Sequence, residues 1–420
     1  MAKKQLSQLQ KTRGVRIKIV GLGGGGCSIV TEMSQRLPGV NFVVADTDLV
    51  NLQRLKNDHL ALFSFGSEVT GGLGTGMNIH LGQKVAQSAR EEVRNLAHDV
   101  DLLILVSCLG GGVGSGALPV FAQAAREENI LSIGVFTLPF NFEGQKRQRL
   151  AQRALKDSAA YLDARMVLSN EKIFKVAGEQ ASFSSALSLI NQSLVENLNA
   201  LLDIIRQPSL INIDFSDLRA ILRGHNQLAF LNNATAEGEK RLESVMQKIH
   251  QADFYSSDPL PADKLLLHIA GGADLKMAEV NAISQQIEQS NPSAQIIFGV
   301  DRRNNFKNQI KVTLLSISSV SEKATRSNQA DKEKTAKSVK KEHSAKPKKK
   351  KKIKPSIQKS SRKKDQLKIK KNAPAPEKQK KKKVKRLNAL DVKELKKKSE
   401  FEKTSQEKVW EIPAFLRRKS

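Results

Sequence analysis

Residues 16–26 have the sequence Arg-Ile-Lys-Ile-Val-Gly-Leu-Gly-Gly-Gly-Gly. The first five are rich in β-branched side chains, which favour a β-strand. The next six are almost all glycine, which lets a backbone approach a phosphate closely and point several N–H groups at it. The segment therefore predicts a strand, a phosphate-binding loop and a following helix.

Apolar runs of the same kind recur through the first half of the chain, separated by helix-like segments. Strands that alternate with helices indicate a parallel sheet covered on both faces, with ligands bound at the carboxyl ends of the strands. The further strands are expected at 41–45, 102–107, 131–137 and 166–168, and helical segments at 84–96 and 121–128.

A long amphipathic segment follows, from Ser184 to Arg206, in which leucine and isoleucine recur at three- and four-residue steps. This spacing places them on one helix face, and Pro208 is expected to end the helix. Three strands (265–270, 294–300 and 310–317) and a helix (275–289) are expected beyond it.

We therefore predict an α/β fold with a Rossmann-like parallel-sheet domain, a long central helix and a smaller C-terminal α/β domain. The expected organisation is a polar leader (1–15), a nucleotide-binding domain (16–183), a central helix with a loop (184–219), a second domain (220–318), a disordered Lys-rich linker (319–408) and a terminal peptide (409–420).

The charge of the chain is concentrated at its C-terminal end. The 420 residues carry a formal charge of +28, but residues 1–320 hold 33 basic and 30 acidic side chains, against 37 and 12 in residues 321–420. The first part is therefore an ordinary globular protein, and this charge distribution argues against a protein that binds nucleic acid along its whole length. The basic part has too few apolar residues to offset its chain entropy, so we expect it to be disordered.

Other protein classes are excluded by composition. Cys27 and Cys108 are the only cysteines, so there is no disulfide framework, and the histidines show no zinc-ligand spacing. No apolar run approaches the length of a bilayer span, and the N-terminal residues lack the apolar core of a secretory signal. The sequence predicts a cytoplasmic protein.

Two more glycine runs, residues 71–76 and 110–116, accompany the first. Alone, the first run fits the dinucleotide fingerprint G-x-G-x-x-G, with Asp46 or Asp48 in the place of a ribose-binding acid. That match favours a nicotinamide or flavin enzyme only weakly. Three phosphate-binding loops suit a triphosphate better, and the P-loop pattern G-x-x-x-x-G-K-[ST] does not occur.

Six segments together resemble the tubulin/FtsZ superfamily, which includes a bacterial cell-division GTPase. GGGVGSG (110–116) is similar to the family's phosphate-loop signature, and NIDFSDLR (212–219) to its catalytic loop. The other four are RIKIVGLGGGGCSIV (16–30), GGLGTGMN (71–78), PFNFEGQKR (139–147) and the terminal IPAFLRR (412–418).

The resemblance implies a site for GTP or GDP with Mg²⁺, the metal being held mainly by the nucleotide. It also implies that the chain forms a head-to-tail homopolymer. The implied nucleotide-binding residues are Gly23, Gly24, Gly25, Gly26, Cys27, Ser28, Gly74, Thr75, Gly76, Gly110, Gly111, Gly112, Val113, Gly114, Ser115, Gly116, Glu143, Arg147, Asn170, Asn191 and Gln192.

The same resemblance implies that hydrolysis is completed in trans. Asp214 and Asp217, with Asn212 beside them, would polarise the attacking water in the site of the next subunit. Without the resemblance, the two aspartates are typical of a solvated turn before a helix, with Asp217 as an N-cap.

Several positions depart from the family pattern. Val113 stands where the family has threonine, so one hydroxyl is missing from the phosphate loop, and Cys27-Ser28 replaces a Gly/Asn-type pair. The guanine-recognising Asn-Asp falls on Asn191-Gln192, and a glutamine offers fewer acceptors to guanine than an aspartate. These departures motivate an alternative, a structural filament that binds nucleotide but hydrolyses little of it.

The tail supports two more expectations. By resemblance, its terminal peptide docks on a membrane-anchoring division protein and so places the chain at the septal ring. The Lys-rich linker is either a spacer alone or a spacer that also contacts anionic lipid or nucleic acid. Any nucleic-acid binding by the linker would be independent of base sequence and sensitive to salt. A further alternative is a protein whose function depends on this polyanion contact. The expected docking residues are Trp410, Ile412, Pro413, Phe415, Leu416 and Arg417.

Overall fold

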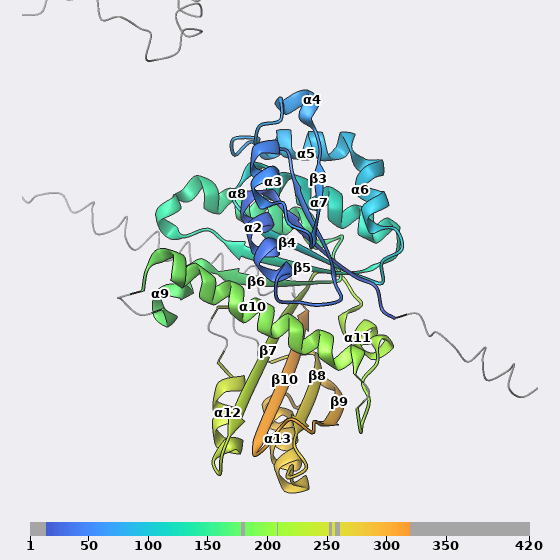
Figure 1. The fold of residues 1–420 in the computed structure, drawn as a ribbon, viewed down its shortest axis with the longest axis vertical. Coiled ribbons are helices and arrows are strands. Elements are labelled where there is room, and N and C mark those ends of the chain that lie inside the picture. Colours follow the sequence, from blue (N-terminus) through green and yellow to red (C-terminus); the bar gives the residue numbers. More distant parts are fainter. Residues whose placement is uncertain (1–13, 178–180, 208, 252–253, 257–260, 320–420) are drawn as a thin grey trace, which may run out of the picture. The chain divides into compact units, whose positions relative to one another are not determined.

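The computed structural model describes residues 14–177, 181–207, 209–251, 254–256 and 261–319, all within one compact unit. Its described strands form one sheet in the order β3-β2-β1-β4-β5-β6-β7-β10-β8-β9 (Figure 1). They are β1 (Ile17–Leu22), β2 (Asn41–Asp46), β3 (Leu60–Ser64), β4 (Leu102–Cys108), β5 (Leu131–Leu138), β6 (Ala164–Ser169), β7 (Gln227–Glu237), β8 (Lys264–Gly271), β9 (Gln295–Arg302) and β10 (Gln309–Ser319).

The six strands from β3 to β6 are parallel, as the alternation of strands and helices predicts. β7 continues the sheet through only two residue pairs with β6, Ala164–Gln227 and Arg165–Leu228. β10 then runs antiparallel to both β7 and β8, and β9 is parallel to β8. The two halves of the sheet are therefore joined by a narrow seam rather than by a full ladder.

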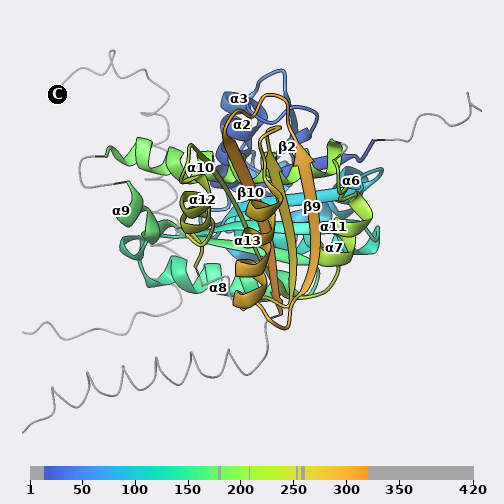
Figure 2. The ribbon, with the colours of Figure 1, turned by 90° about the horizontal axis from the view of Figure 1, so that it is seen from below.

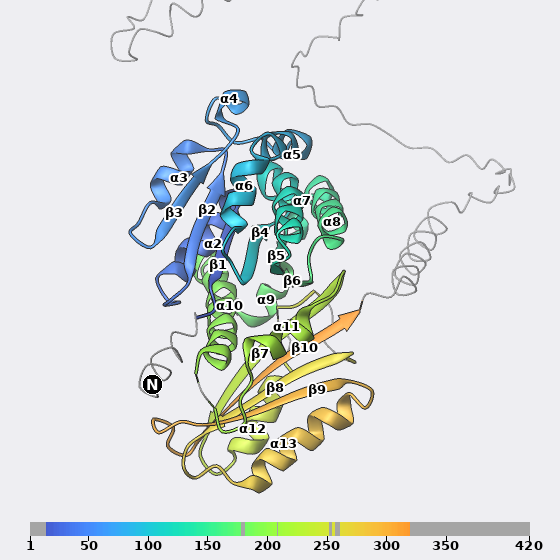
Figure 3. The same cartoon turned by 90° about the vertical axis from the view of Figure 1, so that its right-hand side faces the viewer.

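Helices cover both faces of the parallel half (Figure 3). α2 and α10 pack on one face, and α5, α6, α7 and α8 on the other, each side forming a separate apolar core. The helices in this half are α2 (Gly23–Ser34), α3 (Leu49–Leu55), α4 (Ser67–Thr70), α5 (Ile79–Ser88), α6 (Arg90–Ala97), α7 (Gly112–Glu127), α8 (Gln145–Ala159) and α9 (Ile173–Val176), with short 3₁₀ turns η1 (Asn141–Glu143) and η2 (Asn170–Lys172).

The central helix α10 (Phe183–Arg206) connects this half to the second one, and its buried residues belong to the core that both halves share. α11 (Phe215–Leu222) follows it and packs beside β8. α12 (Arg241–Ile249) and α13 (Met277–Ser290) cover the opposite face of β7–β10, where Figure 2 shows them in front of the strands. The predicted fold class is confirmed.

Several details differ from the sequence-based expectations. The helix expected over 84–96 is interrupted at Ala89, so that α5 and α6 pack separately on α7. β3 and β7 were not expected, and β7 carries two asparagines, Asn232 and Asn233, that interrupt its apolar alternation.

No helix in the described part of the chain is long and apolar enough to span a bilayer. Pro208, the linker and the terminal docking peptide lie outside the described residues.

Candidate functional site

A cavity of about 530 Å³ lies where the carboxyl ends of β1, β2, β4 and β5 meet. Its volume falls in the ordinary range for small-molecule sites. All three glycine runs contribute to its wall, together with the segment after β5. The expected nucleotide-binding residues that line it are Gly23, Gly24, Gly25, Gly74, Thr75, Gly76, Gly111, Gly112, Val113, Gly114, Glu143, Arg147 and Asn170.

Two helices begin at this cavity, α2 after Leu22 and α7 after Gly111. Neither has a side-chain N-cap or an acidic residue in its first turn. The backbone N–H groups of a helix's first turn have no partner within the helix, and they carry partial positive charge. Two uncapped N-termini at one cavity therefore form a strong site for an anionic group such as phosphate.

Glycine is required where these two helices meet. Gly23 has a φ of +69°, and a Cβ at this position would lie 2.7 Å from the backbone nitrogen of Gly114. A Cβ on Gly112 would overlap the hydroxyl oxygen of Thr75. That hydroxyl is buried and has no hydrogen-bond partner among the described residues. The loop 71–76 thus lies tightly against the first turn of α7.

Several expected nucleotide-binding residues do not line the cavity. Ser115 accepts a hydrogen bond of 2.8 Å from the Gly110 nitrogen, and Ser28 donates one of 3.0 Å to the Gly24 carbonyl. Cys27 donates to the carbonyls of Gly21 and Ala45, and burial raises the pKa of its thiol far above the ordinary value. The residues of this group are Gly26, Cys27, Ser28, Gly110, Ser115, Gly116, Asn191 and Gln192.

The two residues expected to recognise guanine face other partners. Asn191 donates a hydrogen bond of 2.8 Å to Glu32, and Gln192 donates one of the same length to Glu196. Asn170, which the sequence analysis also placed at the nucleotide, lines the cavity.

Asp46 and Asp48, which the sequence suggested only as candidate ribose-binding acids, line the cavity. Asp46 is 4% exposed and accepts hydrogen bonds from the Thr47 nitrogen at 2.7 Å and from Asn51 Nδ2 at 3.3 Å. Burial raises the pKa of its carboxyl, and these hydrogen bonds oppose the shift. Their position directly after a predicted strand was the available signal. The other unexpected lining residues are Leu22, Val50, Asn51, Arg54, Cys108, Leu109, Thr137 and Pro139.

These two carboxylates suit Mg²⁺ in chemistry and in number. Mg²⁺ prefers oxygen ligands and is commonly bound by one or two carboxylates together with substrate phosphates. Within the described ranges, no group of three or more acidic, His or Cys side chains is placed to hold a metal alone. The cavity therefore fits a metal that is shared with a bound phosphate group.

Glu143 and Arg147 lie at the edge of the cavity and pair with each other. Glu143 also accepts a hydrogen bond of 2.8 Å from the Phe140 nitrogen, which fixes the turn after β5. Each oxygen of the Glu143 carboxylate thus has one partner, and Arg147 keeps further N–H donors for an anion.

Asp214 and Asp217 are not among the residues that line the cavity. They form a reciprocal capping box at the start of α11: Asp214 accepts from the Asp217 nitrogen at 3.0 Å, and Asp217 from the Asp214 nitrogen at 2.9 Å. The second oxygen of each carboxylate has no partner in the part of the chain that the structure describes. Asn212 accepts a hydrogen bond of 3.3 Å from the Ser209 nitrogen.

Known proteins are similar to this chain both in sequence and in structure. A model of the Tubulin/FtsZ family GTPase domain matches residues 16–178, and a model of the FtsZ family C-terminal domain matches residues 228–318. The chain is 32% identical over 309 residues to the cell division protein FtsZ of Magnetospirillum gryphiswaldense, covering 72% of this chain and 54% of that protein. It is 30% identical over 306 residues to that of Coxiella burnetii, covering 72% and 78%.

The chain thus spans little more than half the length of the first of these relatives.

Among solved structures, an empty FtsZ dimer from M. jannaschii is 29% identical, with a TM-score of 0.65 over 76% of this chain and 92% of that one. CetZ2 from Haloferax volcanii, a GTPγS-bound protofilament, has a TM-score of 0.65 at 23% identity over 77% and 100%, which shows the shared fold alone.

Proposed function

Because this chain belongs to the Tubulin/FtsZ family, we propose that it is a GTPase that assembles head to tail into filaments and hydrolyses GTP where two subunits meet. Filaments fit a contact between unlike surfaces, since such a contact need not close on itself. By family likeness, the filament acts in the cytoplasm at the division site.

The observation that carries this proposal is the separation of two half-sites on one chain. The glycine-lined cavity binds the phosphates, whereas the exposed Asp214 and the half-exposed Asp217 lie on α11. Figures 1 and 3 show α11 far below α4, which directly precedes the glycine loop 71–76. This separation supports the proposal that a second subunit brings the acid pair to a bound nucleotide.

Each half-site has a chemical task in the proposed reaction. The free oxygens of Asp214 and Asp217 would accept hydrogen bonds from a water molecule, orient it and raise its nucleophilicity. The uncapped N-termini of α2 and α7 would stabilise charge that develops on the transferred phosphate. Mg²⁺ would neutralise further phosphate charge, with Asp46 and Asp48 as its protein ligands. Guanine preference would depend on Asn170, the expected amide that lines the cavity.

Phosphate release with Mg²⁺, measured over a range of protein concentrations with GTP and ATP in parallel, tests this proposal. We expect the rate per chain to rise with concentration and GTP to be preferred. Asp214→Asn with Asp217→Asn should lower the rate about 100-fold, since asparagine keeps the helix cap but not the charge. Asp157→Asn, a surface change on α8, is the control.

A rate per chain that does not change with concentration contradicts a shared site. If nucleotide binds but is not hydrolysed, the alternative of a structural filament takes the place of the GTPase.

For the tail, we propose that residues 409–420 dock on a membrane-anchoring partner and that the Lys-rich linker is the tether. Deleting 409–420 should release filaments from the division site in cells without changing GTP hydrolysis in vitro. A function carried by polyanion binding predicts instead that deletion of 321–408 abolishes activity in cells while the terminal deletion does not.

A further inference from the structure

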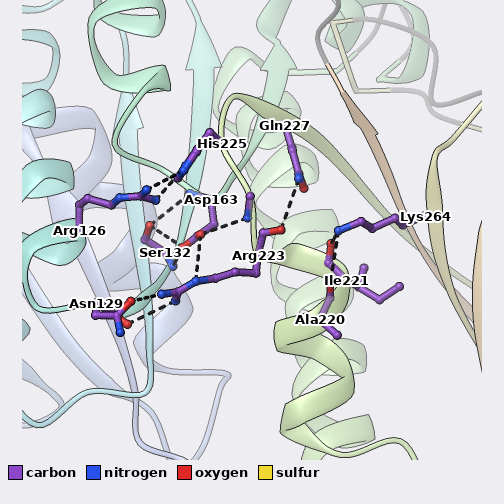
Figure 4. Close-up of polar contacts among 11 residues, drawn as sticks. Arg126, Asn129, Ser132, Asp163, Ala220, Ile221, Arg223, His225, Gln227 and Lys264 are labelled. Carbon is purple, nitrogen blue, oxygen red and sulfur yellow. Dashed lines mark hydrogen bonds and ion pairs between the residues drawn. The ribbon is translucent and has the colours of Figure 1, made fainter.

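A buried carboxylate, Asp163, ties the end of α11 to the nucleotide-binding half of the molecule (Figure 4). Asp163 is 2% exposed and accepts hydrogen bonds from the Ser132 nitrogen at 2.9 Å and from the Gly224 nitrogen at 3.3 Å. Arg223, the C-cap of α11, places its Nε 3.9 Å from the same carboxylate. We call Asn129, Ser132, Asp163, Arg223 and Gly224 the Asp163 joint.

The guanidinium of Arg223 makes further contacts of this joint. It donates to the Asn129 carbonyl at 3.3 Å and also to the Asn129 side-chain oxygen. Asn129 follows α7 with a φ of 57°. The joint therefore attaches α11 to the loop that connects α7 with β5.

The end of α11 is also held from the second half of the sheet. Lys264 of β8 donates to the carbonyls of Ala220 at 3.2 Å and Ile221 at 3.3 Å (Figure 4). These carbonyls belong to the last turn of the helix, where they have no partner within it and carry partial negative charge. Polar contacts from both halves thus meet at the C-terminal end of α11.

These end contacts hold the C-terminal end of α11 by hydrogen bonds, which have preferred angles. Leu218, Ile221 and Leu222 bury the inner face of α11, and the hydrophobic effect that favours this burial is non-directional. The capping box fixes Asp214 and Asp217 to the first turn. Since an eight-residue helix is about 12 Å long, a rotation of about 5° at its C-terminal end moves the two carboxylates by about 1 Å. A displacement of that size can cost about 100-fold in rate.

We propose that Arg223 is a positioning residue for hydrolysis: through the Asp163 joint it sets the direction of α11 and so places Asp214 and Asp217 at the phosphate of the neighbouring subunit. This inference rests on the proposed function. It assigns a positioning role to Arg223, a residue that does not line the cavity and contacts Asp163 and Asn129 instead.

Arg223→Gln tests the inference because it removes the charge and the fork of N–H donors while keeping a polar side chain. We expect nucleotide affinity, measured with a fluorescent GTP analogue, and filament mass, measured by sedimentation, to stay within about twofold of wild type. Phosphate release per polymerised chain should fall about tenfold. Arg223→Lys keeps the charge toward Asp163 and should recover part of the rate.

Two further variants complete the test. Glycine tolerates the positive φ of residue 129, so Asn129→Gly removes the side-chain acceptor with little effect on folding. We expect this variant to lower hydrolysis, and it tests the joint even if Arg223→Gln folds poorly. Arg153→Gln, in an exposed pair with Asp157 on α8, is the matched control and should keep the wild-type rate.

The inference is overturned if Arg223→Gln hydrolyses GTP at the wild-type rate per polymerised chain, or if affinity, filament mass and rate fall together. A wild-type rate per chain that does not rise with concentration is a different failure. It removes the shared site of the proposed function, and the inference with it.

Discussion

Asn191 Nδ2 donates a hydrogen bond of 2.8 Å to Glu32 and thereby joins α10 to α2. This bond engages the side chain that sequence resemblance assigns to guanine recognition, and the residue does not line the cavity. The structure thus separates Asn191 from Asn170, which does line it.

The first prediction compares these two asparagines. Asn191→Ala should keep the preference for GTP over ATP and lower stability by about 1 kcal/mol, the typical worth of one hydrogen bond. Asn170→Ala should reduce the preference. Competition binding with both nucleotides measures it, and a loss of preference in Asn191→Ala alone would assign guanine recognition to α10.

The second prediction concerns the contact between the loop 71–76 and α7. Gly112→Ala should weaken nucleotide binding at least about tenfold, because its Cβ overlaps the Thr75 hydroxyl and lies 3.0 Å from the Asn78 nitrogen. Thr75→Ala added to the same chain should recover part of the affinity, since it removes the overlapping atom. Gly14→Ala, where a Cβ meets nothing within 4 Å, is the control. Unchanged binding by Gly112→Ala would show that the loop moves aside freely.

The third prediction separates metal binding from phosphate repulsion at Asp46. With EDTA, Asp46→Asn should bind GTP at least as tightly as wild type, because a buried carboxylate beside phosphates is removed. With Mg²⁺, wild type should gain more affinity than the variant, because Asp46 supplies an oxygen ligand. Asp58→Asn, on an exposed loop outside the cavity, should behave as wild type. An equal Mg²⁺ gain in both chains would exclude Asp46 as a ligand.

The fourth prediction is a pH dependence of stability from His268, a buried residue of β8. Desolvation lowers its pKa from 6.5 to about 4. The unfolded chain therefore binds more protons than the folded one between these values, and stability falls as the pH drops below about 6.5. His268→Leu should remove about 2 kcal/mol of the loss between pH 7.5 and 5. Urea unfolding at the two pH values measures this, with the exposed His80→Gln as control; an identical loss in His268→Leu would assign it to other groups.

Much of the fold follows from local pattern. The strand runs before the glycine loops and the leucine spacing of α10 predict their elements to within a few residues, because burial periodicity is a local property. β7 was missed because a strand that carries Asn232 and Asn233 has no such pattern. These side chains instead bond to Ile249, Gln251 and Asn197, which are remote in sequence.

The candidate site likewise has a part that the sequence predicts and a part that only the tertiary structure decides. The sequence alone predicted that the three glycine runs contribute to the cavity wall, because close backbone approach and free helix N-termini depend on residues that are adjacent along the chain. Tertiary structure alone decided that Asn191 binds Glu32 and that Arg223 meets Asp163. These side chains are chemically able to take several partners. Which partner each one takes is set by the packing of helices and strands that lie far apart in the sequence.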